Sequence, residues 1–237
     1  MRAGLNLDLF APSLKEAALE DLEQGDVLRF LGKADNTVGL CIVAANGSAL
    51  KERGLYEQAL LHAWAATRTN YAKWPASHLR ALFDWADKAK LRALGDPLPG
   101  PGPFVLYRGI AGTGAFRKPC GISWTSDFAT ACWFAQRIEL LNPAVLRLQL
   151  RQVDVLTYLD NGPYGRAESE FLVLLPRGTH PEIQTDDRDS IRIAAARRAE
   201  HYQAALAARL AHAKSQLAAL ARARAYCEGE GPAPMRD

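Results

Sequence analysis

The chain lacks the patterns that mark metal-binding and disulfide-rich proteins. Its four cysteines are scattered and form no CxxC pair, which favours a reducing compartment over a disulfide-stabilised secreted fold. Its five histidines show no HExxH or Cys/His ligand spacing, so no metal site is predicted. A Walker lysine-serine pair is also missing, and the glycine-rich stretch 109–114 lacks the GxGxxG spacing of a dinucleotide-binding loop.

Long apolar runs and strong net charge are likewise missing. No run approaches the length of a transmembrane helix, and Asp8 interrupts the first apolar residues before a signal-peptide core can form. We therefore expect a cytoplasmic protein that does not bind membranes, unless a specialised route delivers it into a host cell. A net charge of only +3 over 237 residues argues against nucleic acid as a partner.

Proline and glycine gather in residues 95–103, which no regular element can cross, and the apolar pattern changes there. Residues 1–95 show mainly helical spacing, although the run 38–43 could be a strand or a buried helical turn. Residues 96–187 are predicted to form strands over 104–110, 121–125, 145–150, 153–158, 170–175 and 182–185, with one helix from Asp127 to about Arg137. The fold class predicted is α+β with mostly antiparallel sheets.

The C-terminal part is rich in Ala, Leu and Arg, which are strong helix formers. It predicts one long helix over 188–227, followed by a disordered tail over 228–237. Its apolar stripe is expected to lie on the core or on a partner; its members are Tyr202, Leu206, Leu210, Ala213, Leu217 and Leu220.

Three predicted strands carry polar side chains that need an explanation. Arg108 follows Tyr107 inside an otherwise apolar strand, where its donor fork suits a phosphate or carboxylate, unless it is an edge arginine reaching water. Ser123 and Thr125 share one face of the next strand, with Trp124 on the other.

Glu168 and Glu170 come directly before the apolar run 171–175. Residues two apart in a strand project to the same side, so both carboxylates are expected at one site. Burying charge is costly unless something uses or compensates it. The alternative is a polar strand end in solvent.

In the order of these motifs the chain resembles the arginine-serine-glutamate clade of ADP-ribosyltransferases. This family includes clostridial and other bacterial toxins, bacteriophage host-modifying enzymes and vertebrate arginine-specific transferases. The matching motifs lie within 104–176: Tyr107-Arg108-Gly109, Ser123-Trp124-Thr125, the small and aromatic residues 131–135, and Glu168-Ser169-Glu170. Trp124 departs from the commonest Ser-Thr-Ser form of the second motif.

The resemblance implies an ADP-ribosyltransferase-like core, NAD as co-substrate, no metal, and transfer of ADP-ribose to a protein side chain. It assigns Glu170 to the nicotinamide ribose and the oxocarbenium charge, and Glu168 to the incoming nucleophile. Arg108, with Tyr107 and Gly109, would bind the cofactor. Ser123 would position Glu170, with Thr125 supporting the same wall.

In that family, a glutamate at the first acidic position, which is Glu168 here, accompanies arginine as the acceptor. The loop before that position contacts the substrate protein. Tyr164 in that loop is therefore the candidate for acceptor recognition, or else an ordinary exposed loop tyrosine. Two alternatives stay open: an NAD glycohydrolase, and a noncatalytic module that keeps the transferase fold and binds a partner through the long C-terminal helix. Separately, the N-terminal region and that helix are candidate contacts for a partner or cognate inhibitor.

Overall fold

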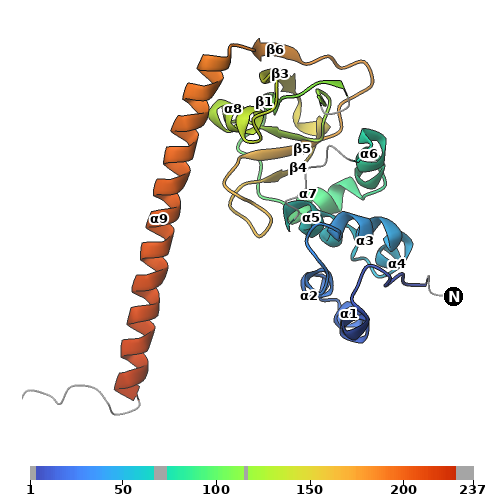
Figure 1. The fold of residues 1–237 in the computed structure, drawn as a ribbon. Helices are drawn as coiled ribbons and strands as arrows, with labels where there is room; N and C mark the ends of the chain where they lie inside the picture. Colours follow the sequence, from blue (N-terminus) through green and yellow to red (C-terminus); the bar gives the residue numbers. More distant parts are fainter. Residues whose placement is uncertain (1–3, 67–73, 115–116, 228–237) are drawn as a thin grey trace, which may run out of the picture.

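The computed structural model describes residues 4–66, 74–114 and 117–227, and it is an α+β protein (Figure 1). The part of the tail predicted to be disordered, 228–237, lies outside these residues. Within the described ranges, no helix is both long enough and apolar enough to cross a membrane.

Short helices make up the N-terminal region, as the apolar spacing predicts. Residues 38–43, left open between strand and helix, fall almost entirely within helix α3. The helices of this region are α1 (Lys15–Glu23), α2 (Val27–Gly32), α3 (Gly39–Ala45), α4 (Gly47–Glu52), α5 (Tyr56–Ala66), α6 (Ala76–Asp84) and α7 (Lys88–Leu94).

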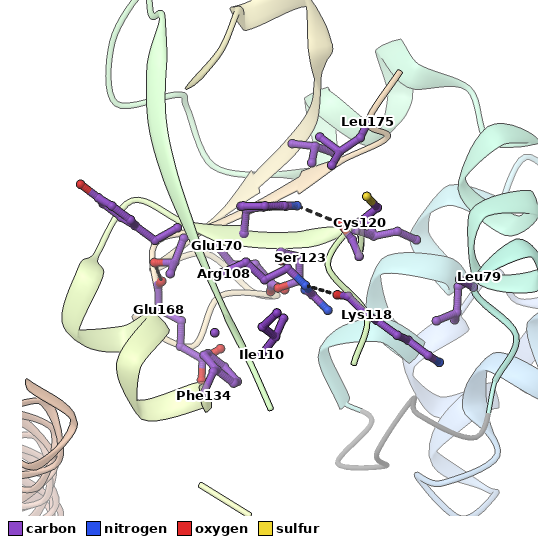
Figure 2. Close-up of a pocket in the computed structure, with 18 of the residues that line it drawn as sticks. Leu79, Arg108, Ile110, Lys118, Cys120, Ser123, Phe134, Glu168, Glu170 and Leu175 are labelled. Carbon is purple, nitrogen blue, oxygen red and sulfur yellow. Dashed lines mark hydrogen bonds between the residues drawn. The ribbon is translucent and has the colours of Figure 1, made fainter. Parts of the chain in front are cut away.

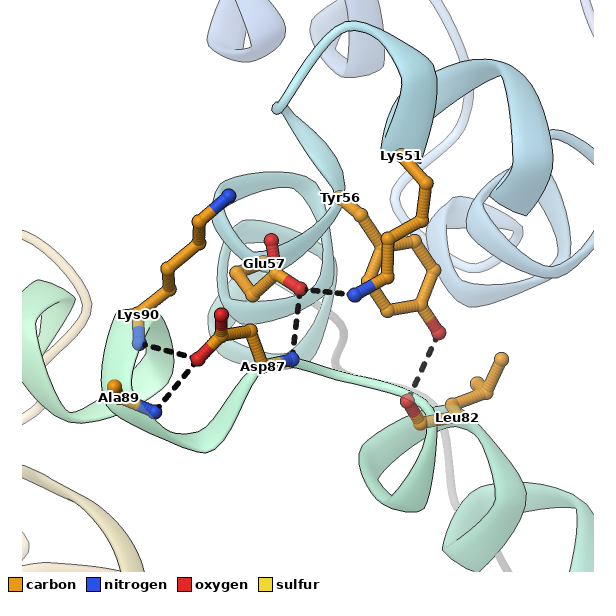
Figure 3. A network of polar contacts seen from close by, with 7 residues as sticks. All are labelled: Lys51, Tyr56, Glu57, Leu82, Asp87, Ala89 and Lys90. Atoms are coloured by element: carbon orange, nitrogen blue, oxygen red, sulfur yellow. Dashed lines mark hydrogen bonds and ion pairs between the residues drawn. The ribbon is translucent and has the colours of Figure 1, made fainter.

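A buried glutamate ties several of these helices together (Figure 3). Glu57 of α5 is 2% exposed and pairs with Lys51 of α4, while its Oε1 also accepts a hydrogen bond of 2.9 Å from the backbone N–H of Asp87. Tyr56 donates its hydroxyl to the carbonyl of Leu82 in α6 at 2.9 Å. Because a buried charge is tolerated only when it is paired and hydrogen-bonded, this network fixes α4, α5 and the start of α7 relative to one another.

Six strands form one continuous sheet with the order β4-β5-β2-β1-β3-β6, and every neighbouring pair is antiparallel. Two strands have the predicted bounds, and the other four differ from the predicted ranges by one or two residues at one or both ends. The strands are β1 (Phe104–Ile110), β2 (Ser123–Thr125), β3 (Ala144–Leu150), β4 (Val155–Leu159), β5 (Glu170–Val173) and β6 (Glu182–Thr185).

The helical region packs directly onto this sheet. Ile122, Leu156 and Leu172 belong to the same buried cluster as the side chains of α1 to α7. Asp96 also forms a bridge with Tyr158 of β4, immediately after α7. Residues on either side of the proline-rich connection therefore share one hydrophobic core.

Helix α8 (Phe128–Gln136) packs against β1, where Gly109 allows a very close approach. A Cβ atom at Gly109 would lie 2.0 Å from the carbonyl oxygen of Ala131 and 2.5 Å from the backbone nitrogen of Ala135. Asp127 caps the helix by accepting a hydrogen bond from the N–H of Ala129. The absence of a side chain at 109 thus sets the spacing between α8 and the centre of the sheet.

Helix α9 (Arg188–Cys227) has the predicted bounds but only part of the predicted packing. Ile191 and Ala195 in its first turns are buried against α8 and β3. Beyond them the helix projects away from the sheet (Figure 1), and Tyr202, Leu210, Leu217 and Leu220 are exposed. Most of the apolar stripe does not lie on the core.

Candidate active site

A cavity of about 650 Å³ lies where β1, β2 and β5 meet the helical region (Figure 2). Its lining includes Arg108, Ser123, Thr125, Glu168 and Glu170, which come from three motifs far apart in the sequence. The sheet order explains the meeting, because β5, β2 and β1 are neighbours. The pocket lies within the size range of small-molecule sites.

Arg108 of β1 holds the segment that leads into β2. Its Nε donates to the carbonyl of Lys118 at 3.1 Å, and its Nη1 donates to the carbonyl of Ser123 at 2.6 Å. The guanidinium lies so close to Gly121 that a Cβ there would be 2.2 Å from Nη2. Because a guanidinium has five N–H donors, these two bonds leave donor capacity for a ligand.

Arg108 is half-buried, and other charged side chains lie near its guanidinium. Burial lowers the pKa of the guanidinium to about 10, and the nearby charge of Glu170 acts in the opposite direction. The side chain therefore stays protonated at neutral pH. Burial and the charge of Arg108 also lower the pKa of Lys118, which lines the same cavity.

The two hydroxyls of β2 play different parts. In the register between β2 and β5, Thr125 lies opposite Glu170 and Ser123 lies opposite Leu172. Thr125 Oγ1 donates to the carbonyl of Glu168 at 2.7 Å and accepts from the N–H of Asp127 at 3.0 Å. Thr125 thus joins the glutamate turn to the start of α8, while Ser123 lines the cavity.

Glu170 opens β5 and is 9% exposed. Its Oε1 accepts a hydrogen bond of 3.2 Å from the indole N–H of Trp64, at the end of α5. The resemblance assigns this positioning to Ser123, but among the described residues the side-chain donor to Glu170 is Trp64. Trp64 is itself 6% exposed and packs edge-on against Phe83, with ring centroids 5.4 Å apart.

Glu168 reaches the cavity from a strained turn and not from a regular strand. Ala167 and Ser169 on either side of it have φ of 55° and 46°, a left-handed conformation that is uncommon for residues other than glycine. The expectation that strand alternation brings the two glutamates to one side is therefore wrong in its mechanism, although both side chains line the cavity.

Hydrogen bonds from three residues, Thr125, Asp160 and Arg198, hold this turn. Asp160 binds it twice, because its carbonyl accepts from the N–H of Ala167 at 2.8 Å and its Oδ1 accepts from the N–H of Ser169 at 3.1 Å. Arg198 of α9 donates through Nη2 to the carbonyl of Ala167 at 3.2 Å. Strain of this kind persists only where the surroundings over-determine it, and it is frequent at functional sites.

The surroundings of Glu168 favour the neutral form of its carboxyl. Burial raises its pKa, and the negative charge of Glu170 raises it further. The positive charges of Arg166, Arg137 and Arg198 act in the opposite direction. A half-buried carboxyl whose pKa is raised in this way is a candidate for acid-base chemistry.

The chain matches no family model, no curated protein and no solved structure. What it does must be inferred from the site itself. No group of three or more His, Cys, Asp or Glu side chains that could hold a metal ion occurs among the described residues.

Tyr164 does not lie where the loop pattern places it. The side chain is 7% exposed and belongs to the buried cluster of the helical region. Burial also raises the pKa of its hydroxyl. The prediction that this loop displays Tyr164 to a protein acceptor is therefore wrong for the conformation described.

Tyr107 and Gly109, the neighbours of Arg108, both line the cavity, and the Tyr107 ring packs edge-on against Phe128 of α8 with centroids 5.5 Å apart.

Sequence reasoning missed the residues that support the glutamates. Trp64 lies 106 positions before Glu170 and fits the apolar spacing of α5, so its pattern indicates only core packing. Asp160 lies in a loop rich in turn residues, and Arg198 is one of several arginines of the long C-terminal helix, so neither stands out in the sequence. Only the fold brings them to the site.

Proposed function

We propose that this chain is an NAD-dependent mono-ADP-ribosyltransferase of the glycosyltransferase class, which transfers ADP-ribose to a protein side chain, with arginine the favoured acceptor, and releases nicotinamide. The observation that carries the proposal is the meeting of Arg108, Ser123, Glu168 and Glu170 at one cavity. These are the residues on which the resemblance to the arginine-serine-glutamate clade rests.

The cavity suits an anionic dinucleotide that also carries a positive charge. Basic side chains along its wall would face the pyrophosphate; they are Arg80, Arg108, Lys118, Arg137 and Arg166. The two glutamates lie on the same lining and offer negative charge to the nicotinamide riboside end. In this proposal Arg108 binds the pyrophosphate or an adjoining ribose, with Tyr107 and Gly109 beside it.

Glu170 is suited to stabilise the cationic transition state. Departure of nicotinamide from the anomeric carbon builds oxocarbenium character on the ribose, as in glycoside cleavage. A carboxylate held in a water-poor site stabilises that charge without reorganising. Glu170 meets both conditions, because it is buried and held in place by Trp64.

Glu168 is suited to act on the acceptor. A raised pKa brings a carboxyl closer to the operating range of a general base. An arginine acceptor is a poor nucleophile while its guanidinium is fully charged, so a second acid beside the anomeric carbon has a clear task. This division of labour favours transfer over hydrolysis.

The test uses NAD labelled in the adenylate half, the purified chain, and either a mixture of proteins or a small guanidine compound as acceptor. We expect labelled acceptor together with released nicotinamide. Glu168→Gln should abolish labelling of the guanidine acceptor but leave slow release of free ADP-ribose. Glu16→Gln, at an exposed position of α1, is the matched control and should behave as the unaltered chain.

Free ADP-ribose with no labelled acceptor would instead identify an NAD glycohydrolase. Failure of the unaltered chain to release nicotinamide with any acceptor would favour a noncatalytic module on the same fold. Either result overturns the transferase proposal.

A further inference from the structure

Helix α9 has two parts with different surroundings. Its first turns are buried at Ile191 and Ala195, and Arg198 donates through Nε to the Thr130 hydroxyl of α8 at 2.8 Å. From His201 to Arg224, every residue whose side chain the structure describes is exposed. At 1.5 Å per residue, this second part extends about 35 Å beyond the domain.

Large apolar side chains lie in water along this second part. Leu210 is 54% exposed, Leu217 is 67% exposed and Leu220 is 66% exposed. Together with Ala213 they follow the alternating spacing of three and four residues that defines the seam of a coiled coil, and Leu206 continues it in the sequence. Most helical stability in proteins comes from packing of an apolar face, so a partner along the seam would stabilise this part of α9.

The charges beside the seam have one sign. Residues 201–227 contain four basic residues, Arg209, Lys214, Arg222 and Arg224, and no Asp or Glu. With Leu210 and Leu217 at the a positions of a heptad, Arg209 falls at a g position and Lys214 falls at an e position, whereas Arg222 falls at f, away from the seam, and Arg224 falls at a. The e and g positions set partner choice in coiled coils.

A second copy of this chain does not fit such a seam. In a parallel pair, the g position of Arg209 faces the e position of Lys214 on the other helix, and an antiparallel pair sets each residue against its own type. Both arrangements place like charges side by side. A membrane surface would accept the basic residues, but the seam is narrow and carries no Trp or Phe to anchor it.

We propose that the projecting part of α9 is a docking surface for an acidic amphipathic helix of a protein partner, whose apolar residues cover Leu210, Leu217 and Leu220 while its Glu or Asp side chains pair with the basic residues at the flanking positions, Arg209 and Lys214. This inference goes beyond the proposed enzymatic activity and does not depend on it.

The test measures binding of the full chain to a fluorescent synthetic helix of about four heptads, with Leu at a and d and Glu at e and g. A second peptide carries Lys in place of each Glu. We expect the affinity for the Glu peptide to be at least about tenfold higher than the affinity for the Lys peptide. The double substitution Leu217→Gln and Leu220→Gln should weaken that binding by about tenfold or more.

Ala211→Gln with Ala218→Gln is the matched control, because both positions are exposed and lie away from the seam. It should leave the affinity for the Glu peptide unchanged. Lys214→Glu should weaken binding of the Glu peptide and strengthen binding of the Lys peptide.

Three results would overturn the proposal. The first is a dimer of the chain, seen by sedimentation, that the leucine substitutions dissociate, because a second copy would then cover the seam. The second is binding to phosphatidylserine vesicles or duplex DNA without binding to the Glu peptide. The third is equal affinity for the two peptides.

Discussion

Removing the indole donor of Trp64 should slow the proposed reaction without unfolding the protein. Trp64→Phe deletes the N–H that reaches Glu170 Oε1 at 3.2 Å, but keeps an aromatic ring against Phe83. Trp64 is almost fully buried and Glu170 is 9% exposed, so water would replace this donor poorly. The carboxylate would then lose the hydrogen bond that fixes its direction in the cavity.

The size of the effect follows from the nature of the bond. A hydrogen bond to a charged group contributes about 1.5 to 3 kcal/mol. If all of it is felt in the transition state, the loss corresponds to about 10- to 150-fold in kcat. Because Glu170 orientation matters more to the reacting ribose than to the bound nucleotide, KM for NAD should change much less than kcat.

The assay is steady-state release of nicotinamide by Trp64→Phe, with thermal unfolding measured in parallel. Trp85→Phe is the matched control, because Trp85 is 51% exposed at the end of α6 and away from the cavity. An unchanged kcat in a folded Trp64→Phe protein would refute the positioning role. A loss of kcat matched by an equal loss in Trp85→Phe would show a general effect of the helical region.

Three further predictions concern the glutamate turn and the helix packed behind it. Arg198→Gln removes a positive charge that lowers the pKa of Glu168, so the acidic limb of the pH profile of transfer should move to higher pH; an unmoved limb would contradict the role of Glu168 as base. Glu168→Gln should stabilise the fold at neutral pH, because a carboxyl with a raised folded-state pKa favours folding only while protonated. That gain in Tm should disappear as the pH falls below 4.5, the ordinary pKa of a glutamate carboxyl, because Glu168 is then protonated in both the folded and the unfolded chain. A gain in Tm that persists below this pH would contradict a raised pKa of Glu168 in the folded protein. Gly109→Ala should destabilise the fold by about 1 to 3 kcal/mol in denaturant unfolding, since its Cβ would meet the Ala131 carbonyl at 2.0 Å, whereas Gly32→Ala meets nothing within 4 Å; similar values for both would refute the close packing of α8 on β1.

Much of the sheet follows from local pattern. Strand β1 could be predicted because it is an apolar run with a single arginine. Helix α8 could be predicted because a capping residue precedes a run of small and aromatic residues. Both patterns are visible in a short stretch of sequence. The gathering of polar side chains at one candidate site could be predicted in part for the same reason. Arg108, Ser123 and the two glutamates are polar residues at places where the pattern expects apolar ones.

What could not be predicted depends on contacts distant in sequence. The left-handed turn at Ala167 and Ser169 gives no sequence signal, because neither residue is glycine and the conformation is held by Asp160 and Arg198. The burial of Tyr164 arises from packing of its loop on the helical region. Sequence spacing identified the stripe of α9 but not that its distal part would project into solvent.

If Glu170 makes this cavity an NAD-cleaving site, replacing its carboxylate by an amide should stop the release of nicotinamide. Purified chain and its Glu170→Gln variant are incubated with NAD and a guanidine acceptor, and released nicotinamide is quantified after both proteins are shown to unfold at similar temperature. We predict nicotinamide release and labelled acceptor from the unaltered chain, and a loss of at least about a hundredfold in the variant. Equal release by the two folded proteins would contradict the assignment.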